Sequence, residues 1–145
     1  MIYIGSDHAG YTLKEEIKKF LESLGYEFID VGTDSIEPAD YPDYAKKVVD
    51  GVLDNPENRG IMICGTGIGS CIAANRHKSI RAALPYNEET ARLSREHNNA
   101  NILCLGGRTM DKELAKKMTR IWLETPFSEA ERHVRRLKKI EEYGT

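Results

Sequence analysis

The stretch Ile61-Met62-Ile63-Cys64-Gly65-Thr66-Gly67-Ile68-Gly69-Ser70 indicates the fold class of this chain. Its first four residues form a continuous apolar run, which is typical of a central parallel strand buried on both faces. The three glycines that follow predict a tight turn into a helix that runs through Ala73 and Ala74. A buried strand, a glycine-rich turn and a helix together make up the first part of a βαβ unit.

The hydrophobic pattern on both sides of this stretch alternates between strand and helix periods. Before it, we predict a strand at 3–4, a helix from 13 to a C-cap at Gly25, a strand at 28–31 and, after a polar segment with Pro38 and Pro42, a helix over 45–52. After it, we predict a strand at 81–84, a helix at about 88–97, a strand at 102–105, a helix from 111 and, beyond Pro126, a last helix over about 128–143. This order predicts one α/β domain over residues 1–145. Its core is a doubly wound (Rossmann-like) parallel sheet of about five strands, with helices on both faces and an extra C-terminal helix.

The composition limits the classes of partner. The 145 residues carry 21 basic and 23 acidic side chains, so the net charge of −2 favours neither a nucleic-acid surface nor a polybasic membrane anchor. No apolar run approaches the roughly 20 residues of a membrane span, and the N-terminal apolar run is too short for a signal peptide. Three irregularly spaced cysteines do not suggest a disulfide framework. We therefore expect a cytoplasmic protein with free thiols.

Polar and glycine-rich residues follow two of the predicted strands, where doubly wound sheets bind their ligands. The first strand leads into Ser6-Asp7-His8-Ala9-Gly10 and the central strand into the loop Gly65–Gly69. Backbone N–H groups that converge at the start of a helix suit an anion, either a phosphate or a developing oxyanion. The loop is neither a Walker loop nor a dinucleotide fingerprint. Taken alone, it is equally consistent with a tight turn that binds nothing.

The position of Cys64 points to chemistry. A thiol that faces the start of a helix is favoured as the thiolate, which is a competent base or nucleophile. The alternative is a buried cysteine that merely completes an apolar strand. We prefer this alternative for Cys71 and Cys104, which lie inside a predicted helix and strand. For Cys64, the adjacent glycine loop favours a functional role.

The histidines leave more alternatives open. His8 follows a strand end and either faces the site or fills a turn. His97 closes a predicted helix, where it also suits the helix dipole. His77 and His133 are expected to have only surface roles. No His/Cys spacing in the sequence suggests a zinc site.

Arg132 and Arg136 lie four residues apart on the last predicted helix and therefore share a face. Paired guanidinium groups can bind a phosphate. A solvated basic face is the alternative, because other basic residues lie nearby. The apolar residues of this helix lie on the opposite side, and they are Ala130, Val134 and Leu137.

Taken together, these motifs closely resemble the type-B ribose-5-phosphate isomerases, nearly from end to end. The matching segments are Gly5-Ser6-Asp7-His8-Ala9-Gly10, Asp40-Tyr41-Pro42, Cys64-Gly65-Thr66-Gly67-Ile68-Gly69, Leu93-Ser94-Arg95-Glu96-His97-Asn98, Gly107-Arg108, and Arg132 with Arg136. Several motifs in one order over a matching length are far more specific than any one of them.

The resemblance implies an aldose–ketose isomerase that interconverts ribose 5-phosphate and ribulose 5-phosphate in the non-oxidative pentose phosphate pathway, without metal or organic cofactor. It assigns Cys64 as the base that moves a proton between C1 and C2, assisted by Thr66. It assigns His97 to ring opening, aided by Asp7. The implied substrate contacts are His8, Tyr41, Gly65, Gly67, Ile68, Gly69, Asn98, Arg108, Arg132 and Arg136. Family members build the site between subunits, so we expect a homodimer or a dimer of dimers.

Three other functions remain open at this point. An isomerase for a six-carbon substrate, such as allose 6-phosphate or galactose 6-phosphate, would share most of the scaffold. A thiol phosphatase also has a cysteine before a glycine-rich loop, but no arginine closes this loop as that chemistry requires. A sugar-phosphate sensor without catalytic activity is the least favoured, because Cys64, His97 and the arginine pair are all present.

Overall fold

All five strands of the computed structural model, which describes residues 1–144, run parallel in one sheet with the order β2-β1-β3-β5-β4. The strands are β1 (Ile2–Ser6), β2 (Phe28–Asp30), β3 (Arg59–Cys64), β4 (Ala82–Ala83) and β5 (Ile102–Gly106). The helices are α1 (Tyr11–Ser23), α2 (Tyr41–Leu53), α3 (Ile68–Asn75), α4 (Glu88–Glu96), α5 (Lys112–Glu124) and α6 (Glu131–Tyr143). This arrangement confirms the predicted fold class.

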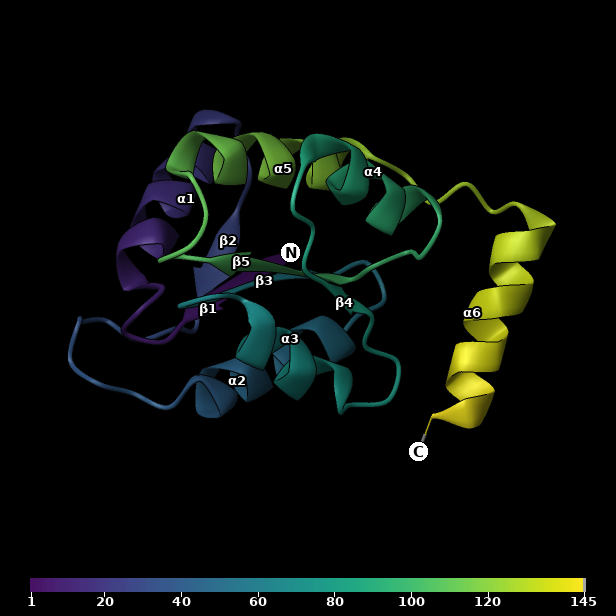
Figure 1. The fold of residues 1–145 in the computed structure, drawn as a ribbon, viewed down its shortest axis with the longest axis horizontal. Helices are drawn as coiled ribbons and strands as arrows, with labels where there is room; N and C mark the ends of the chain where they lie inside the picture. Colours follow the sequence, from purple (N-terminus) through teal and green to yellow (C-terminus); the bar gives the residue numbers. More distant parts are fainter. Residues whose placement is uncertain (145) are drawn as a thin grey trace.

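Helices cover both faces of the sheet (Figure 1). Helices α1, α4 and α5 lie on one face, and α2 and α3 lie on the other. Side chains alternate along β3 between the two layers: Ile61 and Ile63 pack with α1 and α5, whereas Met62 packs with α2. Both sides of β3 are therefore buried, as its continuous apolar run predicts.

The end of α1 follows the sequence prediction closely. Gly25 has a φ of 80° and follows the C-cap of the helix. The N–H of Tyr26 donates to the carbonyl of Leu21 at 3.0 Å, and the N–H of Gly25 donates to that of Glu22 at 3.0 Å. These two hydrogen bonds form a Schellman motif, which requires a left-handed residue such as glycine.

Some predicted boundaries are wrong. Pro42 lies in the first turn of α2 rather than before the helix, which is possible because the first-turn N–H groups of a helix need no partner within it. Strand β4 contains only Ala82 and Ala83, because it is an edge strand that pairs with β5 alone. Helix α6 begins at Glu131 rather than near 128.

The strand order places the carboxyl ends of β1 and β3 next to each other. Ser6 is paired with Ile63, so the residues that follow the two strands emerge side by side. Connections from β1 and from β3 run to opposite halves of the sheet, and such a switch point opens a crevice for ligands.

Helix α6 differs from the other helices in its position. It lies beside the sheet at the β4 edge and covers neither face (Figure 1). Two of its apolar side chains, Val134 and Ile140, are about half exposed. Among the described residues, no helix has the length and hydrophobicity that crossing a membrane requires.

Candidate functional site

A cleft of about 400 Å³ opens where β1 and β3 end, and we call it the Cys64 cleft. The residues that line it come from the segment after β1, the start of α2, the glycine loop and the segment after β5. They are Asp7, His8, Ala9, Tyr41, Cys64, Gly65, Thr66, Ile68, Gly69 and Arg108. The cleft thus brings together most of the site residues predicted from the sequence.

The Cys64 thiol sits at the base of this cleft with two donors beside it. The N–H of Gly67 points at Sγ from 3.2 Å, and the hydroxyl of Ser70 lies 3.2 Å from the same sulfur. The Ser70 hydroxyl is also 3.2 Å from the carbonyl of Gly67, and Ser70 is fully buried. The single hydroxyl proton can bond only one of these partners at a time, so a change in charge on the sulfur can redirect it.

Two glycines of the loop are required by its shape. Gly67 has a φ of 80°, and a side chain there would also meet Leu84 at 2.6 Å. A side chain at Gly69 would meet the ring of Tyr41 at 2.6 Å, so glycine lets this ring approach the loop. The end of β5 holds the loop from the other side, because the N–H of Arg108 donates to the carbonyl of Gly65 at 2.9 Å.

Asp7 and His8 are both held by backbone groups. A carboxylate oxygen of Asp7 accepts the N–H of Gly10 at 3.0 Å, in a buried position. The Nδ1 of His8 lies 3.0 Å from the N–H of Ala39 and 3.2 Å from its carbonyl. Because Nδ1 of His8 contacts the backbone of Ala39, Nε2 is the ring nitrogen that can bind a ligand in the cleft.

The other predicted residues do not line the Cys64 cleft. His97 caps the C-terminus of α4, Asn98 follows it, and Arg132 and Arg136 are exposed on α6. The rings of His97 and His133 stack with centroids 4.2 Å apart and planes 18° from parallel. We call these five residues the His97 cluster.

A surface role for His133 is wrong. Its side chain is buried, although Arg132 and Val134 on either side of it are exposed. Burial, together with the nearby charges of His97, Arg132 and Arg136, lowers the pKa of His133. Sequence reasoning missed this because helical periodicity on a charge-rich helix does not indicate which residue turns inward. His77 is half buried, with Nδ1 3.2 Å from the carbonyl of Ala73.

Ser70 is a second residue that sequence reasoning missed. The available signal was its position in the first turn of the helix after Cys64, where a hydroxyl can fold back toward the preceding loop. Cys104 is buried in β5, as predicted, whereas Cys71 is only half buried in α3.

The buried side chain of Arg95 stabilises the end of α4 next to the His97 cluster. Its guanidinium donates to the side chain of Asn99 at 2.9 Å and to the carbonyl of Thr125 at 3.2 Å. It thereby joins the end of α4 to the segment that leads to α6. Burial, and then the charges of Arg59 and Arg81, lower the pKa of Arg95 to about 10.

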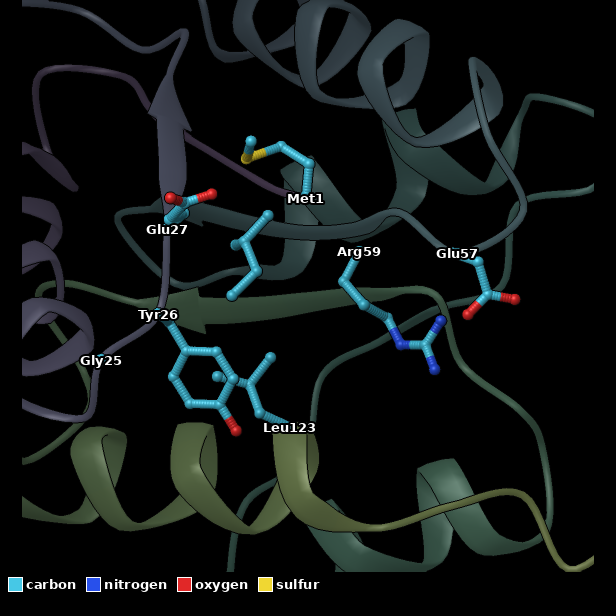
Figure 2. A pocket seen from close by; sticks show the side chains of 8 residues that line it. Met1, Gly25, Tyr26, Glu27, Glu57, Arg59 and Leu123 are labelled. Atoms are coloured by element: carbon cyan, nitrogen blue, oxygen red, sulfur yellow. The ribbon is translucent and has the colours of Figure 1, made fainter.

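A second cavity, of about 560 Å³, lies at the amino ends of the strands. Figure 2 shows Arg59 and Glu57 on one side of it and Tyr26 with Leu123 on the other. It contains none of the predicted site residues, and it lies at the edge of the sheet opposite to the one where such folds bind ligands. Within residues 1–144, no three His, Cys, Asp or Glu side chains are grouped closely enough to bind a metal ion.

Comparison with known proteins identifies relatives over the whole fold. Residues 2–140 match the family model described as Ribose/Galactose Isomerase. The "Ribose-5-phosphate isomerase B" of Escherichia coli is 44% identical over 139 residues, which cover 96% of this chain and 93% of that protein. A crystal structure of a ribose 5-phosphate isomerase from Thermotoga maritima is 53% identical, covers 97% of each chain and superposes with a TM-score of 0.94.

A third relative has a ligand bound. The structure of ribose-5-phosphate isomerase B from Mycoplasma genitalium with bound ribulose-5-phosphate is 42% identical to this chain. The match covers 98% of this chain and 94% of that one, with a TM-score of 0.93.

Proposed function

This chain belongs to the ribose/galactose isomerase family and is an isomerase, and we propose that it interconverts ribose 5-phosphate and ribulose 5-phosphate through a cis-enediolate. The observation that carries the proposal is the Cys64 thiol at the base of a cleft, with the amide of Gly67 and the hydroxyl of Ser70 directed at its sulfur. The ribulose 5-phosphate bound to the Mycoplasma genitalium relative supports the choice of substrate.

Cys64 acts as the base in this proposal. As the thiolate, it takes the proton from C2 of the open-chain aldose, and the C–H electron pair forms the C1–C2 double bond. The C1 carbonyl oxygen thereby becomes an oxyanion, which the N–H groups of the glycine loop stabilise. The thiol then returns the proton to C1 while the C2 hydroxyl proton moves to O1, with Thr66 at the rim to assist. The thiolate is regenerated and no other reactant is consumed.

Two side chains with nitrogen donors on the rim bind the phosphate. Nε2 of His8 remains available as a donor. The exposed side chain of Arg108 lies beside Gly65, because a Cβ atom added to this glycine would be 3.6 Å from Cδ of Arg108. Arginine suits phosphate because its planar donors bind two oxygens at once. Binding energy from this remote group holds the reacting carbons against Cys64.

Ring opening requires the His97 cluster, which does not line the Cys64 cleft of its own chain. We assign it to the cleft of a second subunit in a homodimer. There His97 moves the anomeric proton to the ring oxygen as the C1–O bond breaks, aided by Asp7 of the cleft, while Arg132 and Arg136 bind the phosphate. Asn98 and Tyr41 contact hydroxyl groups.

Two exposed apolar surfaces support the dimer. On α3, next to the cleft, Ile68 and Ile72 are 54% and 61% exposed. On α6, Val134 and Ile140 are 47% and 53% exposed. Exposed apolar side chains such as these suit a surface that meets another chain in an assembly.

The direct experiment measures conversion of ribose 5-phosphate by the purified protein beside its Cys64→Ala variant. We expect turnover by the parent and a loss on the order of 10³–10⁴-fold in the variant, which is the usual contribution of a positioned base. Cys71→Ala is the matched control, because this thiol does not line the cleft and its sulfur lies 3.5 Å from the carbonyl of Ala82. A variant at Cys64 that retains parental turnover would disprove the assignment of the base.

A mixing experiment tests the shared site. Cys64→Ala and His97→Ala should each retain only a small residual activity alone, and mixed subunits should recover about a quarter of the parental activity. Half of the random dimers are then hybrids with one intact site of two. If each chain carried a complete site, mixing would restore nothing.

The family description also names galactose, so a six-carbon sugar phosphate is the second candidate substrate. Comparing kcat/KM for ribose 5-phosphate, allose 6-phosphate and galactose 6-phosphate decides between them. A higher value for either six-carbon substrate would overturn the choice of substrate and leave the role of Cys64 in place.

A further inference from the structure

We propose that His133 is a positioning residue for His97: its ring sets the plane of the His97 imidazole and links it to the helix that carries Arg132 and Arg136. The inference rests on the proposed function, because it assumes that His97 opens the sugar ring. It concerns a residue that does not itself need to touch the substrate.

Stacking against His133 orients the ring of His97. The two rings are stacked 4.2 Å apart and 18° from parallel, so one face of the His97 ring lies against His133. The side chain of His97 nevertheless remains 37% exposed. The stack therefore fixes the orientation of the ring and leaves part of it open to a ligand.

Helix α6 is attached to the rest of the chain near its start, near its end and through His133. Helix α6 lies beside the sheet and covers neither face (Figure 1), so few contacts determine its position. Near its start, the N–H of Ser128 donates to the carbonyl of Glu96 at 3.0 Å. Near its end, Arg81 pairs with Glu141 at 3.4 Å. His133 supplies the buried side-chain contact between these two points.

Together, these contacts make α4 and α6 one unit. His133 is flanked by Arg132 and lies one helical turn from Arg136, so a shift of its ring moves the arginines and His97 together. A ring-opening group and phosphate-binding groups that move as one keep a constant distance, and a displacement of about 1 Å in such a site can cost 10²-fold in rate.

The side chain of His133 is suited to a contact through the face of its ring. Its Nε2 is buried and, within residues 1–144, bonds to no other group. The stack uses the face of the ring, so a phenyl ring can replace it without loss of a hydrogen bond at Nε2. This allows a matched pair of variants: His133→Phe keeps an aromatic face, and His133→Leu fills similar space without one.

The experiment separates ring opening from proton transfer. Ribose 5-phosphate is mostly a closed ring, whereas ribulose 5-phosphate stays open because the oxygen that would close its five-membered ring carries the phosphate. Turnover of ribose 5-phosphate therefore requires ring opening, and deuterium uptake from solvent at C1 of ribulose 5-phosphate does not. Nuclear magnetic resonance measures both, and circular dichroism checks that each variant is folded.

We expect His133→Leu to lower kcat for ribose 5-phosphate on the order of tenfold or more and His133→Phe to stay within about threefold of the parent. At saturating ribulose 5-phosphate, the maximal rate of deuterium uptake should stay within about twofold of the parent in both variants, because Cys64 is untouched and a displaced arginine pair raises KM rather than lowering this rate. The double variant His97→Ala/His133→Leu should be no slower than His97→Ala alone, since His133 acts through His97.

Several results would overturn the proposal. Equal turnover of ribose 5-phosphate by the Leu and Phe variants would show that the aromatic ring is not needed. An equal loss of turnover and deuterium uptake would indicate a general structural role, and a double variant slower than His97→Ala would indicate direct substrate contact. Failure of the proposed function is recognised separately: the His97→Ala variant would then keep parental turnover, or the parent would show no deuterium uptake.

Discussion

The Cys64 cleft and the His97 cluster are held in place by different kinds of contact. Backbone groups define the cleft: paired strands bring Asp7 and Cys64 together, and the amides after β5 bind the carbonyls of the glycine loop. Side chains define the cluster, through the ring of His133 and the guanidinium of Arg95. All residues that line the cleft thus belong to one chain. The cluster instead lies at the surface, where a second chain can contact it.

This difference has a mechanistic consequence. A base and an oxyanion-binding loop require donors that do not reorganise during the reaction, and a backbone held in a sheet provides them. In the proposed mechanism, the groups that bind phosphate and open the ring act on a substrate that must enter and leave. Arg132 and Arg136 lie on the peripheral helix α6, which is compatible with that requirement, and His97 at the end of α4 contacts this helix through His133.

The largest effect is expected from substitutions on α6. Replacing both Arg132 and Arg136 by Ala should lower kcat/KM for ribose 5-phosphate about 10²–10³-fold, because each removes a charge-assisted hydrogen bond to phosphate. Both side chains are exposed, so the melting temperature should hardly change. Steady-state kinetics and thermal unfolding measure the two effects.

Arg135→Ala is the matched control on the same helix. Arg135 is also exposed, but it pairs with Glu131 at 3.0 Å. We expect its kcat/KM to stay within about twofold of the parent, since exposed ion pairs contribute little. An equal loss in Arg135→Ala would mean that only the overall charge of α6 matters.

A smaller effect is expected inside the cleft. Ser70→Ala removes the hydroxyl beside the Cys64 sulfur and should lower kcat about fivefold, which corresponds to one ordinary hydrogen bond. Ser70→Thr keeps the hydroxyl and should restore most of the rate if the added methyl group is accommodated. Pre-steady-state kinetics of both variants provides the measurement, and an unchanged rate in Ser70→Ala would exclude a role for this hydroxyl.

The smallest effect is a pH dependence of the cluster. The pKa of His133 is lowered in the folded chain by burial and by His97, Arg132 and Arg136, and only Glu96 opposes this. The folded state therefore binds the proton more weakly than the unfolded state. The contribution of His133 to stability is present above its unfolded pKa of about 6.5 and is lost as the pH falls toward its folded value.

The matched measurement compares melting temperatures of the parent and His133→Phe. Phenylalanine does not titrate, so the parent should lose a few degrees relative to the variant, at most, between about pH 7.5 and 5.5. A constant difference between the two proteins over this range would show that His133 does not titrate at the stack.

Much of the fold could be predicted because local sequence determines it. The apolar run before Cys64 requires burial on both faces, and Gly25 ends α1 because glycine readily adopts a left-handed backbone. The glycine loop was recognisable for the same reason, since a positive φ and the close approach of the Tyr41 ring both restrict what can replace glycine. These constraints act within a few residues of the chain, so periodicity and residue type reveal them.

Other features depended on contacts between distant segments. The insertion of β5 between β3 and β4 decided that β4 is a two-residue edge strand, and no local pattern specifies which strand pairs with which. The stack of His97 on His133 joins residues 36 positions apart, and it depends on how α6 docks. From the sequence alone, the type and order of the helices and strands and the glycine-rich turn after β3 could be predicted, because they follow from local backbone and burial preferences. Only the tertiary structure decided which side chains are brought together, because packing between elements selects among many patterns that are locally equivalent.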